Sequence, residues 1–339
     1  LWVGTGKGLS KFDGFEFFDV PFPDSSEECY ATAGFQDKSG RLWFGCNDGS
    51  IYFTTGNDLK QVAIKNSRTI SEIVPGPGGL IYIIPQGEAI FSIDPENPSK
   101  VRSYIIDGSL VLFSACFSQT EELLIGTQEN IHVCTFQGDS IKISETISGF
   151  NYAGIRAIHR INSGDGFLIG TEGSGLYKLS VSDGKKVLSR FQDHPELENL
   201  TIQTIYKDSD GFYWVSTYDA GVYRISISEN EEIGYLTVFD KKSGLPGNSI
   251  RIVFQDYEGN YWIGLFGDGL SVLNSLSFSF HSPGLTPEAN NIIYINKLEK
   301  EYFLGTPDGY YLYDLNNNKT ISYTELKKKT SDSEIAAYN

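Results

Sequence analysis

Aromatic rings, arginines and carboxylates beside glycine turns are the residues of this sequence best suited to chemistry. Aromatic faces stack on sugar rings, while Asp, Asn and Arg side chains hydrogen-bond hydroxyl groups, so this mixture favours carbohydrate binding over catalysis. The candidates in turns are Lys7, Asn47, Asp48, Glu172, Tyr218, Asp219, Phe266 and Asp268. The candidates at the starts of expected inner strands are Tyr152, Arg156 and Arg251. The alternative is that each is an ordinary solvated loop residue.

Catalytic chemistry has less support in the sequence. The four histidines fall in different parts of the chain with no metal-ligand spacing, at His132, His159, His194 and His281. No GxSxG, HExxH or phosphate-binding loop is present. We therefore predict no catalytic residues, no cofactor and no metal.

The four cysteines, Cys29, Cys46, Cys116 and Cys134, form no CxxC motif and have no nearby pair of histidines. We interpret them as buried free thiols, because Cys is among the most buried residue types. A bridge between Cys116 and Cys134 is the alternative that the sequence leaves open.

The charge of the chain limits its partners. With 27 Lys and Arg against 43 Asp and Glu, the 339 residues carry a formal net charge of −16. This excess of carboxylates repels phosphate backbones and anionic lipid surfaces, so we expect no nucleic-acid partner. No apolar run approaches the roughly 20 residues needed to span a bilayer, so a membrane is expected only through segments that this sequence lacks.

A repeated motif explains how the candidates are positioned. YWIGLFGDGLSVL, LWVGTGKGLSKF, LWFGCNDGSIYF and YWVSTYDAGVYRI share an aromatic pair, a small anchor residue, a glycine turn and an apolar run. The anchors are Gly4, Gly45, Ile84, Gly126, Gly170, Ser216, Gly264 and Gly305. Their spacing of 39–48 residues, without long helical patterns, is typical of propeller blades.

Each unit reads as four strands. IRIVFQD alternates apolar and polar residues as an inner strand does, YEGN and DSDG read as hairpin turns, and the Trp-bearing strand follows. A calcium loop is the weaker reading of DSDG, because the further oxygen ligands are not in register. The anchor lets neighbouring blades pack closely, and the Trp fills the space between them. We predict an all-β protein, a β-propeller of four-stranded blades, in which turns after the second strand and loops before the inner strand share one face.

The stretch GLPGNSIRIVFQDYEGNYWIG, together with LWVGTGKGLSKFDG, resembles the repeat of two-component regulator propellers. The resemblance is strong around Gly4, Gly45, Ser216 and Gly264 and marginal at Ile84. It implies the periplasmic sensor region of a membrane-bound hybrid histidine kinase of Bacteroidetes. It further implies an oligosaccharide ligand and control of polysaccharide-utilisation genes, and we expect the sensor to work as a homodimer.

The domain organisation follows from the count of units. We predict one seven-bladed propeller over residues 1–281, with a first blade lacking its inner strand, then a linker over 282–289. Residues 290–339 would begin a second propeller. In the alternative, eight units close one ring and the tail SEIAAYN supplies the missing inner strand.

We expect this sequence to be a non-enzymatic, ligand-sensing propeller. Two other functions stay open. A propeller lyase or glycosidase would use a carboxylate or His in its central funnel and turn over its substrate. A protein–protein scaffold would present an apolar or charged patch and give no response to small molecules.

Overall fold

The structure is a computed structural model that divides into two compact units, Leu1–Asn274 and Ser275–Asn339. It describes residues 1–23, 29–56, 58–87, 89–106, 110–161, 166–182, 184–274, 294–298, 301–307, 309–314 and 319–322. In these residues no helix combines the length and the apolar character that crossing a membrane would take.

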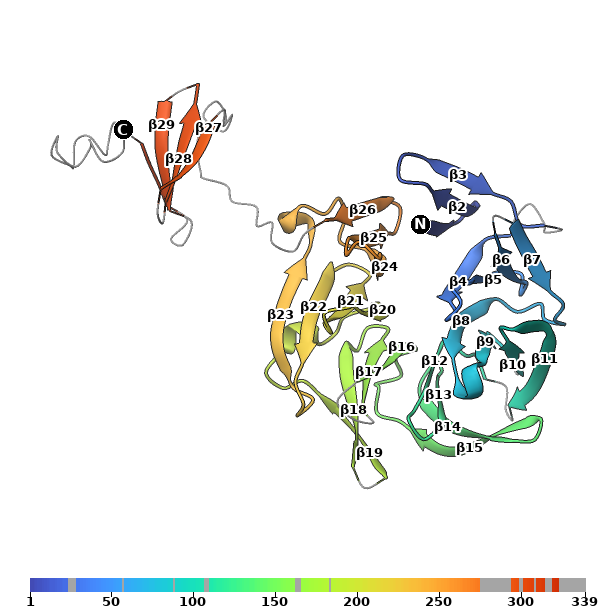
Figure 1. Cartoon of the computed structure of the whole chain (residues 1–339). Helices are drawn as coiled ribbons and strands as arrows, with labels where there is room; N and C mark the ends of the chain where they lie inside the picture. Colours follow the sequence, from blue (N-terminus) through green and yellow to red (C-terminus); the bar gives the residue numbers. More distant parts are fainter. Residues whose placement is uncertain are drawn as a thin grey trace. The chain divides into compact units, whose positions relative to one another are not determined.

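Consecutive antiparallel meanders build the first unit (Figure 1). The three-stranded first meander is β1 (Trp2–Thr5), β2 (Gly8–Phe12) and β3 (Phe17–Val20). The second meander is β4 (Ala31–Gln36), β5 (Leu42–Cys46), β6 (Ile51–Thr55) and β7 (Asp58–Val62). The third is β8 (Ile70–Pro75), β9 (Ile81–Pro85), β10 (Ala89–Asp94) and β11 (Asn97–Ile106). The fourth meander is β12 (Ser114–Phe117), β13 (Leu123–Gly126), β14 (Ile131–Gln137) and β15 (Ser140–Ile147). The fifth is β16 (Ile155–Arg160), β17 (Phe167–Thr171), β18 (Leu176–Ser182) and β19 (Lys185–Arg190).

Two further meanders complete this unit. They are β20 (Ile202–Lys207), β21 (Tyr213–Thr217), β22 (Val222–Ile227), β23 (Ile233–Phe239), and β24 (Ile250–Gln255), β25 (Tyr261–Leu265), β26 (Leu270–Leu273). Short 3₁₀ turns lie at Pro77–Gly79, Pro195–Leu197 and Lys241–Ser243. In the second unit, β27 (Tyr294–Leu298), β28 (Glu301–Thr306), β29 (Gly309–Asp314) and β30 (Lys319–Ser322) form one antiparallel meander.

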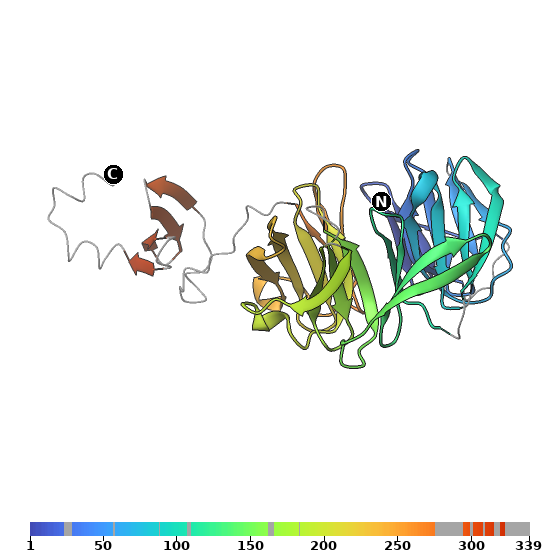
Figure 2. The same cartoon turned by 90° about the horizontal axis from the view of Figure 1, so that it is seen from below.

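The meanders of the first unit follow one another around a common centre. Figure 1 shows the first strand of each four-stranded meander toward that centre and the fourth strand outside, and Figure 2 shows the same sheets from below. Consecutive first strands contact one another from β4 through β8, β12, β16 and β20 to β24. Phe12 of β2 and Trp262 of β25 bring the first and last meanders together, with ring centroids 5.5 Å apart.

Small anchor residues allow this close packing. A Cβ atom at Gly45 would lie 2.5 Å from Cγ2 of Ile70 on the next inner strand, and one at Gly170 would lie 2.5 Å from Cγ2 of Ile202. These distances are well inside van der Waals contact, so a larger residue would push the sheets apart.

The Trp residues pack as the sequence predicts. Trp43 and Trp214 are fully buried between sheets. Each indole Nε1 donates to an Asp six residues earlier, in the turn between the first two strands: Trp43 to Asp37 at 2.9 Å and Trp214 to Asp208 at 2.9 Å. The hairpin reading of DSDG is therefore confirmed, with Gly211 at φ +89°.

One connection departs from a simple series of blades. The outer strands β11 and β15 pair in parallel, through Ile105 with Ser140 and Ile106 with Ile141. This pairing joins the third and fourth meanders into one eight-stranded sheet. In that sheet β13 lies between β12, which carries Cys116, and β14, which carries Cys134, and both thiols are free. The alternative of a bridge between these two cysteines is therefore wrong.

The all-β propeller class is thus confirmed. The seven-bladed closure and the limits 1–281, 282–289 and 290–339 remain predictions. The expected linker 282–289 and the tail SEIAAYN lie outside the described residues.

Candidate functional site

Two kinds of segment meet at one edge of each sheet. In an antiparallel pair the end of the second strand lies beside the start of the first, so the turn and the preceding loop are neighbours. A recurring backbone hydrogen bond fixes this contact. The N–H of Glu172 donates to Gly154 O at 2.9 Å, and that of Tyr218 donates to Thr201 O at 2.9 Å. The turn and loop candidates therefore share an edge within each sheet.

A bulge near the start of the inner strand recurs in successive meanders. The pairing with the second strand shifts register between Ala31 and Ala33, and equivalently in β8, β16, β20 and β24. The extra residues, which we call the bulge residues, are Thr32, Ser71, Arg156, Gln203 and Arg251. Bulges re-aim side chains and are frequent next to functional sites. Both candidate arginines are thus bulge residues.

The first cluster of candidates surrounds Arg156. Its Nε donates to Glu172 Oε2 at 2.9 Å, and its guanidinium carbon lies 4.2 Å from the ring centroid of Phe113. A Cβ atom at Gly154 would lie 3.2 Å from the same carboxylate oxygen, so that glycine leaves room for the pair. The side chains of Arg156 and Glu172 stay 33% and 44% exposed, so the pair is reachable from solvent.

The second cluster surrounds Phe266. Tyr218 packs edge-on against it with ring centroids 5.3 Å apart, and the guanidinium carbon of Arg251 lies 5.1 Å from the Phe266 centroid. Thr204 Oγ1 donates to the Arg251 carbonyl at 3.2 Å and so ties β24 to β20. Tyr218 is 51% exposed. In the described part of the chain Arg251 makes no ion pair, which leaves its donors for an external acceptor.

The remaining candidates have local roles in turns. Asn47 Oδ1 accepts from Tyr30 N at 2.8 Å, and Asp48 Oδ1 accepts from Ser50 N at 2.9 Å. Asp268 lies beside Gly247, where a Cβ atom would come within 2.2 Å of its Oδ2. Further exposed candidates are Lys7 in the β1–β2 turn, Asp219 in the β21–β22 turn, and Tyr152 before β16, which has φ +61°.

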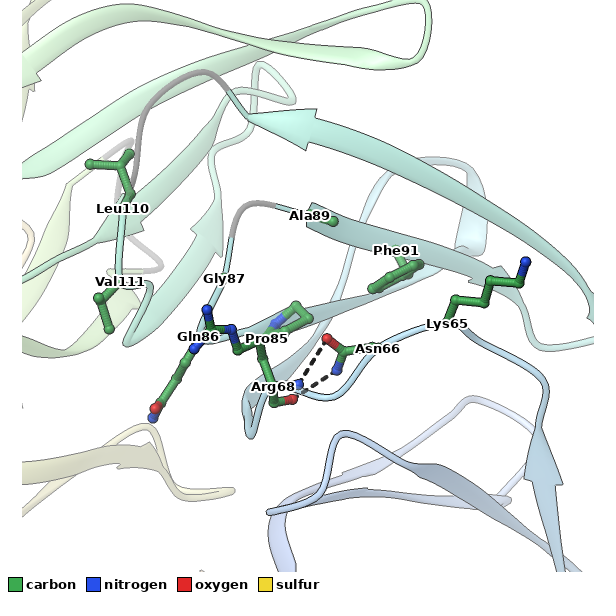
Figure 3. A pocket seen from close by; sticks show the side chains of 10 residues that line it. All are labelled: Lys65, Asn66, Arg68, Pro85, Gln86, Gly87, Ala89, Phe91, Leu110 and Val111. Atoms are coloured by element: carbon green, nitrogen blue, oxygen red, sulfur yellow. Dashed lines mark hydrogen bonds between the residues drawn. The ribbon is translucent and has the colours of Figure 1, made fainter.

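A pocket of about 320 Å³ opens in the third meander (Figure 3). It lies between the segment before β8, the turn after β9 and the segment before β12. Its lining residues are Lys65, Asn66, Arg68, Pro85, Gln86, Gly87, Ala89, Phe91, Leu110 and Val111. Asn66 shapes one wall, because its Nδ2 donates to Arg68 O at 2.7 Å and its Oδ1 accepts from Arg68 N at 3.1 Å. The combination of two cationic side chains and an apolar wall suits a partly polar ligand.

The sequence did not predict this pocket. The motif around Ile84 is degenerate, so no ligand-binding residue was predicted near it. The run KNSR, Lys65–Arg68, was the available signal, because it precedes an inner strand as Arg156 and Arg251 begin one.

One ionisable group near this edge has a strongly shifted pKa. Glu72 follows the bulge residue Ser71 in β8, and its Oε2 accepts from the N–H of Ala115 in β12 at 2.7 Å. Burial of the carboxyl raises the pKa of Glu72 to about 8, although the hydrogen bond from Ala115 opposes the shift. By contrast, burial lowers the pKa of His159, whose Nδ1 lies 3.0 Å from Arg160 O. Neither group belongs to either arginine cluster.

The repeated meanders, their small anchors and the shared edge define the chain as a β-propeller with a candidate binding edge. Residues 196–219 and 244–267 match the model of the family described as two-component regulator propeller. These two stretches therefore match two-component regulator propeller repeats, and the family resemblance is confirmed for them. The second matched stretch contains Arg251 and Phe266, and the first contains Tyr218.

Solved structures share the fold at low sequence identity. A virginiamycin B lyase of Staphylococcus aureus is 16% identical with a TM-score of 0.60, over 78% of this chain and 87% of that chain. PorZ, a component of the type-IX secretion system of Porphyromonas gingivalis, is 14% identical with a TM-score of 0.62, over 94% of this chain and 57% of that chain. The extracellular domain of a putative hybrid two-component system of B. thetaiotaomicron is 16% identical over 95% of this chain and 57% of that chain, but its TM-score of 0.39 is too low to show a shared fold. A comparison with curated proteins found no match.

Proposed function

We propose that this chain is the ligand-sensing part of a membrane-bound hybrid two-component regulator and that it binds an oligosaccharide on the periplasmic side. The family match supports a sensor role. The observation that carries the carbohydrate proposal is the cluster of Arg251, Phe266 and Tyr218, in which exposed aromatic surface lies beside a cation without an ion-pair partner among the described residues.

The cluster offers the two interactions that sugars need. The exposed face of Tyr218 provides stacking area, and the guanidinium of Arg251 provides several hydrogen-bond donors in a fixed plane. The Arg156–Glu172 pair adds a donor and an acceptor from another sheet of the same unit. The receptor would have two arrangements, either of the protomers in a homodimer or of its domains. The ligand would bind one arrangement with higher affinity, and binding would therefore shift the receptor toward it. The output would be histidine kinase activity that controls polysaccharide-utilisation genes.

A thermal-shift screen against purified neutral and acidic oligosaccharides tests the proposal. A ligand at 100 times its dissociation constant adds about 2.7 kcal/mol to the free energy of unfolding. For a protein of this size that corresponds to a rise of roughly a few degrees in Tm. Hits are analysed by chromatography for cleavage, because turnover of the sugar would contradict a sensor and indicate an enzyme. A uniformly flat screen of the full receptor ectodomain would contradict the carbohydrate ligand.

A further inference from the structure

Three potential metal ligands, Cys29, Cys46 and Asp48, converge in the second meander. The two sulfur atoms and a carboxylate oxygen all lie within 4.8 Å of one another. Cys29 lies just before β4, Cys46 is the last residue of β5, and Asp48 lies in the turn that follows. In the part of the chain that the structure describes, no fourth His, Cys, Asp or Glu joins this group.

Backbone pairing explains why residues 17 positions apart meet. Ala31 pairs with Cys46 across β4 and β5. Beyond this pair, Asn47 N donates to Tyr30 O at 3.1 Å, and Tyr30 N donates to Asn47 Oδ1 at 2.8 Å. These bonds hold the segment before β4 against the β5–β6 turn, so the position of Cys29 beside the turn follows from the fold.

The surroundings favour metal–thiolate bonds. Cys46 is 0% exposed and Cys29 is 5% exposed, and they pack in a cluster with Leu9, Phe44 and Tyr52. A dry shell strengthens electrostatic attraction and limits exchange with water. Asp48 is half-buried, and its carboxylate is oriented by the hydrogen bond from Ser50 N.

We propose that Cys29, Cys46 and Asp48 bind one zinc ion. Two thiolates suit a borderline-soft cation, whereas calcium and magnesium prefer oxygen ligands alone. A tetrahedral zinc ion places its ligand atoms roughly 3.5–4 Å apart, so only small side-chain movements are required. Among the described residues no fourth His, Cys, Asp or Glu completes the tetrahedron, so the fourth position is left to an external ligand.

The charge balance of binding is simple. The two thiols lose their protons to solvent, and Zn²⁺ with two thiolates and one carboxylate leaves a net charge of −1 at the site. Because Cys binds zinc as the thiolate, metal affinity should strengthen as the pH rises. The zinc ion would link the chain leading into β4 to the β5–β6 turn.

Cobalt substitution tests the site directly. Metal-free protein, prepared with chelator and reductant, is titrated with Co²⁺ while the thiolate-to-cobalt charge-transfer absorption is followed, and Zn²⁺ is then added. We expect one equivalent of Co²⁺ per chain, displaced by Zn²⁺, and at least a tenfold loss of affinity in Cys46→Ser. The matched control is Cys134→Ser, a thiol that is also 0% exposed but lies on β14, and it should bind normally.

Asp48→Asn provides a second variant that leaves the buried thiols in place, and it should bind Co²⁺ more weakly while unfolding normally. Absence of the charge-transfer band in the wild type would overturn the proposal. So would equal binding by wild type and Cys46→Ser, or a Cys29–Cys46 disulfide, seen as the loss of two hydrogens in the mass of unreduced protein. None of these outcomes depends on oligosaccharide binding.

Discussion

Asp208 and Trp214 form the centre of a buried polar network that joins two sheets. Asp208 Oδ2 accepts from Trp214 Nε1 at 2.9 Å and from the hydroxyl of Tyr261, in the next meander, at 3.0 Å. Arg224 approaches the same oxygen with Nε and Nη2, each at 3.3 Å. The side chain of Asp208 is 0% exposed and that of Arg224 is 9% exposed. One carboxylate therefore satisfies donors from three other side chains and neutralises a buried cation.

Asp208→Ala should lower the free energy of unfolding by about 3 kcal/mol, because the buried Arg224 would keep, among the described residues, only the exposed carboxylate of Asp210, whose Oδ2 lies 3.9 Å from Nη2. The matched control is Asp256→Ala. Asp256 Oδ2 accepts from Trp262 Nε1 at 2.8 Å in the equivalent turn, and Asn260 Nδ2 donates to it at 3.0 Å, but both donors are neutral. We expect about 1–2 kcal/mol for the control. Urea unfolding followed by Trp fluorescence measures both, and equal losses would contradict the role of Arg224.

Ser216→Ala should stabilise the protein by about 1 kcal/mol. Ser216 occupies an anchor position and is fully buried, and its Oγ has no hydrogen-bond partner among the residues that the structure describes, so the hydroxyl costs desolvation without compensation. Ser114→Ala is the contrasting variant, since the equally buried Ser114 Oγ donates to Ile155 O at 2.9 Å. That change should destabilise by about 1 kcal/mol. Thermal unfolding in which both variants shift Tm in the same direction would contradict this account.

Glu72→Gln should stabilise the protein increasingly as the pH rises from about 5 to 8. The pKa of Glu72 rises from 4.5 in the unfolded chain to about 8 in the folded state. The folded state therefore binds this proton more tightly, and the stability it contributes is full below pH 4.5 and is lost as the pH rises through 8. Gln stays neutral and keeps an acceptor for the Ala115 N–H. Urea unfolding at pH 5 and 8 gives the two values, with the exposed Glu129→Gln as a control that should show no such trend.

Arg251→Ala should reduce the affinity for an oligosaccharide identified in the screen by at least tenfold, because it removes donors and uncovers Phe266. Arg102→Ala is the matched control. Arg102 also lies over an aromatic ring, 5.4 Å from the Tyr104 centroid, but on the outer strand β11. Isothermal titration calorimetry should show unchanged binding for the control. Equal affinities for all three proteins would place the ligand elsewhere.

Tyr218→Ala provides an independent test of stacking. We expect a loss of about 1–2 kcal/mol in binding free energy, with little change in unfolding, because half of the side chain is already exposed. Tyr235 on the outer strand β23 is 49% exposed and serves as the matched control. A Tyr235→Ala variant that loses as much affinity as Tyr218→Ala would show that the effect is not local to the cluster.

Much of the fold could be predicted from the sequence because its signals are local. The small anchors, such as Gly45, and the Asp–Gly turns each act within one unit or between adjacent units, so their repetition predicts the meanders. The pairing of Trp43 with Asp37 is likewise contained within six residues. The parallel contact of β11 with β15 could not be predicted, because it depends on how far two outer strands extend.

The candidate site was predictable to a smaller extent. The prediction that turns after the second strand and the starts of inner strands share one face selected Arg156, Glu172, Tyr218, Arg251 and Phe266. In the structure Arg156 contacts Glu172, and Tyr218 and Arg251 contact Phe266. It did not select Phe113, since an apolar residue before a strand carries no distinguishing signal. The convergence of Cys29 and Cys46 was missed because strand pairing, and not sequence spacing, brings the two thiols together.

The parallel pairing of β11 with β15 has a consequence for local opening. Repeated sheets that touch only through side chains can open one at a time, whereas the third and fourth meanders also share backbone hydrogen bonds and the exposed Arg102–Asp139 ion pair. Their amide protons should therefore exchange with solvent as one cooperative block, with a higher opening free energy than those of the second meander. Because the pocket in Figure 3 is lined by the third meander and by the segment before β12, its walls should open as part of this block.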